Sequence, residues 1–150
     1  MHRREMLPNT VRLSKVVTEA QEKVRNYVTA SLHYMENALL MVSQGDAGKA
    51  SELLWGSVAE AVLALAASRG KQLANHRSLH WFIGVLSKEL NDQSIAEAFY
   101  VAENLHQKGF HEIELDIRDV ALVLEPIRKL VTKLLDLIPK ELINEPLVNI

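Results

Sequence analysis

The sequence contains no cysteine, and this absence removes several chemistries at once. Disulfides, thiolate-bound metals and cysteine nucleophiles are all excluded. Proline and glycine are also scarce, with 4 and 6 residues, so few positions interrupt regular segments and long elements are expected. The net charge is only −2, which gives no overall attraction to nucleic acid or to an anionic membrane. Binding to either would need a local basic patch.

What is present fits one globular domain. The apolar share of 48% and the charged share of 24% argue against a disordered chain. We expect a single domain over residues 1–150, with an ordered core over about 13–138 and tails at 1–10 and 140–150 that are either docked or loose. No apolar run follows the basic N-terminal residues, and the most apolar stretch, Val58–Ala67, is too short to span a bilayer and contains Glu60. These features predict a cytoplasmic protein with no membrane partner.

Apolar residues recur with helical spacing along the whole chain. The pattern predicts helices over about 13–42, 47–68, 77–90, 95–108 and 113–138, the last with a kink at Pro126. The fold class is therefore all-α, an up-and-down bundle of about five helices. Gly45 and Asp46 mark the turn before the second helix, whereas Asn75 and Ser78 are both possible caps of the third. The second helix is apolar on most sides and should be central.

The fifth predicted helix has two apolar sides. Its main stripe alternates steps of three and four residues, and a second set of leucines points elsewhere: Leu115, Leu122, Leu130 and Leu137. Either the long first helix covers this second side or another subunit does. We predict a homodimer, while packing entirely within one chain remains the alternative.

A basic segment is the most unusual local feature. No acidic residue occurs between Glu60 and Glu89, and Lys71, His76 and Arg77 should gather at the start of the third helix. Free backbone N–H groups at a helix start favour anions, so these residues form a candidate site for a nucleotide or an RNA phosphate. The alternative is an ordinary solvated basic loop.

Histidines offer the remaining candidate chemistry. His76 and His80 lie four residues apart and share a helix face, but zinc needs a third ligand and no neighbour in sequence supplies one. We therefore predict no metal and no other cofactor. His106 leans toward the apolar stripe of the fourth helix, where packing is a more usual role for histidine than catalysis.

Two segments give a family resemblance. The segment Trp-Gly-Ser-Val-Ala-Glu-Ala at 55–61 and the segment Leu-His-x-x-x-Phe-x-Glu at 105–112 resemble the archaeal PaREP-type repetitive-element proteins, which are grouped with the HEPN-like bundles. The likeness covers about Leu32 to Leu137. It implies a compact up-and-down helical bundle that is often dimeric.

The resemblance also implies candidate activities. Active members of the HEPN group are metal-independent ribonucleases that use an Arg and a His with four to six residues between them, and others bind a nucleotide or pair with a nucleotidyltransferase-like partner. Arg69 and His76 match the spacing but lie between the second and third helices, and no Arg accompanies His106 or His111 in the late region. We therefore expect a non-enzymatic module. An RNA-cleaving toxin-like enzyme that uses His106, or Arg69 with His76, is the alternative, and an adaptor that binds a helical partner through its fifth helix is a third possibility.

Overall fold

The computed structural model describes residues 2–111 and 115–143, and within them the chain is entirely helical apart from short connections. The helices are α1 (His2–Ser43), α2 (Ala47–Ser68), α3 (His76–Glu89), α4 (Gln93–His111), α5 (Ile117–Asp136) and the single turn α6 (Lys140–Ile143). The prediction of an all-α fold with about five substantial helices is confirmed. α4 ends at His111, three residues beyond the end that the sequence pattern predicted at about 108.

α1 starts much earlier than the sequence pattern predicted. It begins at His2 rather than near residue 13 and is about 60 Å long. Residues 2–12 lack the apolar period that the prediction relied on, and Pro8 disfavours a continuous helix, so the sequence pattern placed the start after this segment. The proposed boundary between a loose tail and the core therefore does not coincide with the start of the helix.

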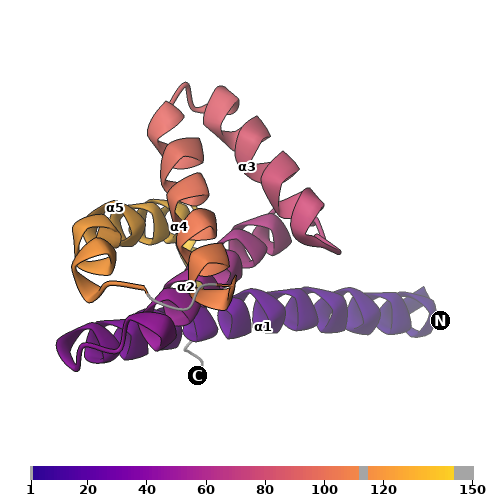
Figure 1. Cartoon of the computed structure of the whole chain (residues 1–150). Coiled ribbons are helices and arrows are strands. Elements are labelled where there is room, and N and C mark those ends of the chain that lie inside the picture. The colour runs from indigo at the N-terminus through magenta and orange to yellow at the C-terminus, as the bar shows by residue number, and fades with distance from the viewer. Residues whose placement is uncertain (1, 112–114, 144–150) are drawn as a thin grey trace.

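α1 and α2 form the antiparallel pair on which the other helices pack (Figure 1). Gly45 makes the turn with a φ of 77°, and Asp46 caps α2 by accepting a hydrogen bond from the backbone N–H of Lys49. Where the two helices meet, the Ser31 hydroxyl donates to the Ser57 carbonyl at 2.7 Å and the Ser57 hydroxyl donates to the Ser31 carbonyl at 2.8 Å. Both serines are fully buried, so this serine seam holds the helices together through small side chains.

α2 is the central helix, as its composition predicted. It packs against α1, α3, α4 and α5, and Leu54, Val58, Val62 and Leu65 are completely buried. Within the described residues it is also the single helix long and apolar enough to cross a membrane by length and composition. However, 56% of its apolar window is buried inside the fold, which is typical of a core helix.

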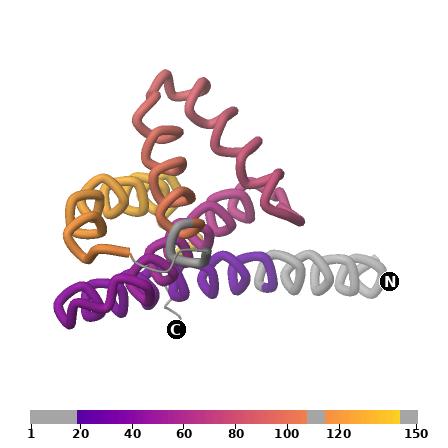
Figure 2. The backbone as a smooth tube through the Cα atoms, viewed as in Figure 1, coloured from indigo at the N-terminus to yellow at the C-terminus, as the bar shows by residue number. Residues whose placement is uncertain are grey.

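α3 and α4 rise from α2 as a hairpin and meet at the end far from α1 (Figure 1; the same path is traced in Figure 2). Asn75 is the N-cap of α3, because its side chain accepts from the Ser78 N–H while the Ser78 hydroxyl accepts from the Asn75 N–H. This capping box uses both residues that the sequence left as alternatives. At the far end, Asp92 pairs with Lys133 of α5 and so ties the hairpin to that helix.

α5 continues through Pro126 and buries the predicted stripe, including Val120, Ile127, Val131 and Leu134. The second set of leucines is buried to different extents. Leu130 is buried and Leu115 and Leu137 are partly buried within the chain, whereas Leu122 is 77% exposed. Ile113 and the residues from 144 onward lie outside the described residues. Within the C-terminal segment 140–143, Leu142 and Ile143 dock against the core.

Candidate functional site

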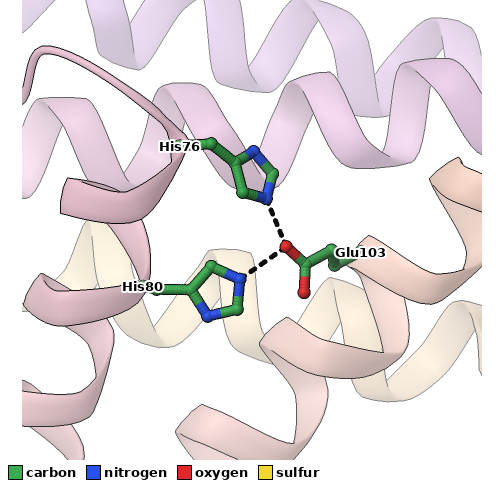
Figure 3. A group of neighbouring side chains, drawn as sticks. All are labelled: His76, His80 and Glu103. Carbon is green, nitrogen blue, oxygen red and sulfur yellow. Dashed lines mark hydrogen bonds and ion pairs between the residues drawn. The ribbon is translucent and has the colours of Figure 1, made fainter.

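Three polar side chains converge between α3 and α4. His76 and His80 occupy positions four residues apart on α3, so both project from one side of that helix. Glu103 reaches them from α4, and Figure 3 shows the two imidazole rings turned toward its carboxylate. We call these three residues the His–Glu cluster.

Both histidines contact the same carboxylate oxygen. The Nε2 atom of His76 forms an ion pair with Oε2 of Glu103, and Nε2 of His80 lies 2.5 Å from the same atom. The Glu103 side chain is 13% exposed, compared with 33% for His80 and 48% for His76. The carboxylate is therefore the sheltered member of the cluster, and His76 faces water.

The histidines keep Glu103 ionised. Burial by itself raises the pKa of the Glu103 carboxyl, but hydrogen bonds from His76 and His80 and their positive charge lower the pKa more, so that it lies below its usual value. The two histidines therefore favour the ionised form of Glu103.

Aromatic rings fix the orientation of the cluster. Trp55 of α2 lies 5.2 Å from the His76 ring, and the His80 ring lies 5.1 Å from Phe99 and 5.4 Å from Tyr100, as distances between ring centroids. Contacts on this scale restrict the side-chain rotamers, so the imidazoles are held in place before any ligand binds.

His106 stacks on Trp55, the same indole ring that contacts His76. Its ring lies 5.6 Å from Trp55 and is inclined to the indole by only 20°. Burial lowers the pKa of His106 below its usual value, although the negative charges of Glu52 and Glu103 oppose that shift. His106 is therefore a neutral imidazole at neutral pH, packed beside the cluster as the sequence predicted for a histidine leaning toward the core.

The structure separates the predicted Arg69 and His76 pair. Arg69 binds Glu89 at 3.1 Å, and Glu89 is the last residue of α3, whereas His76 is the first. The two ends of α3 are about 20 Å apart. Arg69 and His76 therefore serve different carboxylates and do not face one reacting bond.

The predicted phosphate site is only partly assembled. Lys71 lies with its Nζ atom 5.3 Å from the centre of the Trp81 ring, and Arg77 is exposed on the outer side of α3. His76, the third predicted member, points instead to Glu103. Asn75 already occupies the Ser78 N–H at the helix start, which leaves fewer free backbone donors for an anion than we expected.

Sequence reasoning missed Glu103. It lies 27 residues from His76 and 23 from His80, so the search for a third ligand among sequence neighbours could not find it. One signal was available: Glu103 follows Ala102 on the buried stripe of α4, and a carboxylate at the edge of such a stripe usually has a partner.

Comparison with protein families agrees with the resemblance noted in the sequence. Residues 26–131 match the model described as the archaeal PaREP1/PaREP8 family. The chain belongs to this family. No curated protein sequence matches the chain. The PaREP1/PaREP8 match extends from α1 into α5 and includes every residue of the His–Glu cluster together with Trp55 and His106.

Proposed function

We propose that this PaREP1/PaREP8 chain is a HEPN-like, non-enzymatic helical module of the cytoplasm that acts as a homodimer and binds a nucleotide or single-stranded RNA. The binding surface is the outer face of α3 together with Lys71. The observation that carries the proposal is the exposed Trp81 ring with the Lys71 ammonium group over it.

The outer face of α3 combines an aromatic platform with positive charge. Arg77 and Trp81 lie four residues apart on this face, Lys88 lies near its end, and Trp81 is 55% exposed. Among the described residues, none of Lys71, Arg77 and Lys88 has a carboxylate partner, so their charge is available to a ligand. Proteins that bind single strands stack bases on aromatic rings and neutralise phosphates with cations, and this face offers both groups.

Exposed leucines support the homodimer. Leu32 and Leu40 of α1 are half exposed and eight residues apart, which places them on one side of that helix, and Leu122 is the most exposed large apolar side chain of α5. Burial of such residues against a second copy would remove apolar surface from water. Either α1 or α5 can supply the interface.

A titration tests the binding proposal. Adenosine nucleotides and a short single-stranded RNA are added to isotope-labelled protein, and the amide shifts of residues 71–88 are followed. We expect shifts centred on Trp81 and an affinity that falls as salt is raised. Trp81→Ala should weaken binding on the order of tenfold to a hundredfold, because stacking of one base contributes about 1–3 kcal/mol.

Lys129→Ala is the matched control, since Lys129 is an exposed cation on α5, away from the proposed surface. It should bind as the unmodified chain does. Unchanged shifts in α3 with every nucleotide and RNA, or equal losses in Lys71→Ala and Lys129→Ala, would remove the proposal.

A second candidate function is metal-independent cleavage of RNA by His106. Its lowered pKa favours it, since a neutral imidazole can accept a proton at neutral pH. Labelled RNA is incubated with the protein in EDTA, and the unmodified chain is compared with His106→Ala and His76→Ala. Cleavage that disappears in His106→Ala would establish this function, and intact RNA in all samples would retire it.

A further inference from the structure

The His–Glu cluster brings together the donor atoms that a transition metal prefers. The two Nε2 atoms and a carboxylate oxygen of Glu103 all lie within 4.8 Å of one another. Two imidazoles and one carboxylate are ligands that suit zinc and related divalent ions, whereas magnesium and calcium prefer oxygen alone.

The distances leave little to adjust. Zinc binds histidine nitrogen and carboxylate oxygen at about 2.0–2.2 Å, and tetrahedral geometry then separates its ligand atoms by about 3.3 Å. The Nε2 atom of His80 now lies 2.5 Å from Oε2 of Glu103, so the side chains must move apart by about 0.8 Å to admit the ion. Both histidines project from one side of α3 and the carboxylate already faces them, so the ion would enter between side chains that point toward one another.

Neighbouring residues restrict the orientation of the proposed ligands. Trp55, Phe99 and Tyr100 restrict the imidazole rings, and the capping box at Asn75 fixes the first turn of α3. A metal ligand must be deprotonated, and a glutamate side chain meets this requirement at neutral pH. The negative charge of Glu103 lies between the two imidazoles, and each imidazole can direct a nitrogen lone pair toward a cation.

We propose that His76, His80 and Glu103 bind a divalent transition-metal ion, with Zn²⁺ the best fit, and that the ion joins α3 to α4. Among the described residues no further His, Asp or Glu offers a ligand atom within the same 4.8 Å, which leaves a coordination position for water or another ligand. Three protein ligands and one open position are the arrangement of zinc sites that can engage a further ligand. The site stands apart from the Trp81 face and does not depend on RNA binding.

The alternative is a cluster held by hydrogen bonds alone, and Glu103→Gln separates the two. A glutamine oxygen still accepts a hydrogen bond from an imidazole N–H, but a neutral amide is a poor zinc ligand. If the cluster is only hydrogen-bonded, Glu103→Gln leaves the response to zinc unchanged. If it is a metal site, the same substitution abolishes that response.

The experiment uses the full chain, freed of any histidine tag and treated with chelator. Zn²⁺ is titrated in a calorimeter, and Co²⁺ is added separately because its visible absorption reports coordination geometry. We expect one ion per chain and a tetrahedral Co²⁺ spectrum that Zn²⁺ displaces. Mg²⁺ should produce no heat.

Variants locate the site. His80→Ala and Glu103→Gln should each weaken Zn²⁺ binding by more than the 10–100-fold typical of changes outside the metal's own ligands. His33→Ala is the matched control, because His33 is an exposed histidine on α1, and its affinity should be unchanged. Circular dichroism confirms that each variant folds. Absence of Zn²⁺ binding, or binding that His80→Ala and Glu103→Gln leave intact, would overturn the proposal.

Discussion

The serine seam between α1 and α2 gives the sharpest test of how the helices pack. Ser31 and Ser57 are fully buried, and each hydroxyl donates to the carbonyl of the other residue. A buried hydrogen bond of this kind contributes about 0.5–1.5 kcal/mol net. Ser31→Ala and Ser57→Ala should therefore each lower the free energy of unfolding by about 1 kcal/mol.

The double variant distinguishes two hydrogen-bonding patterns for the two serine hydroxyls. Since the acceptors are backbone carbonyls, which both substitutions leave in place, the two losses should add to about 2 kcal/mol, or a fall in Tm of about 4–8 °C for a chain of this size. The two hydroxyl oxygens are 3.4 Å apart. If they bonded mainly to each other, either single substitution would cost as much as the double one.

A larger residue at the same position tests the close approach itself. Ser57→Leu places extra carbon atoms where α1 and α2 meet, and overpacking typically costs about 1–3 kcal/mol beyond the lost hydrogen bond. Urea unfolding followed by circular dichroism measures the unmodified chain and the four variants. Ser43→Ala is the control, because the Ser43 hydroxyl is exposed and bonds within its own helix, to Leu40. Ser57→Leu as stable as the unmodified chain would refute the α1–α2 packing described here.

Three further predictions concern acid stability and association. The hydrogen bond from Lys133, together with those from Ser94, lowers the pKa of Asp92. Ionised Asp92 therefore stabilises the fold fully above its unfolded pKa, and this stabilisation is lost below about pH 4. Urea unfolding at a series of pH values should show that Asp92→Asn lowers the free energy of unfolding less and less as the pH falls into that range. Burial raises the pKa of Glu60, which means that ionising it disfavours the fold as pH rises; Glu60→Gln should be more stable than the unmodified chain at neutral pH, and this gain should vanish below about pH 4. In light scattering we expect a dimer, and Leu122→Glu should yield monomers if α5 forms the interface, whereas an unchanged mass would assign the interface to α1.

The parts of the fold predicted from sequence are those specified by local signals. α2 has the predicted bounds, because Gly45 with Asp46 and Gly70 bracket one apolar run. The buried stripe of α5 follows from a regular heptad that a proline does not disturb. The start of α1 was not predictable in the same way, since residues 2–12 have no apolar period and contain Pro8.

The candidate site depends on distant contacts, and sequence spacing misled us there. Arg69 and His76 are near neighbours in sequence, yet they bind carboxylates at opposite ends of α3. Glu103 joins His76 and His80 only because α4 folds back beside α3, and the angle between two helices is set by side-chain packing along their whole contact. A helical pattern shows which residues share a face, but it does not show which faces meet.

Anomalous diffraction at the zinc absorption edge, from crystals exposed to Zn²⁺, tests the metal site most directly. We predict one strong peak within bonding distance of Nε2 of His76, Nε2 of His80 and a carboxylate oxygen of Glu103. A map in which the two histidines and Glu103 remain hydrogen-bonded with no peak between them, or in which zinc occupies other histidines alone, would contradict the site.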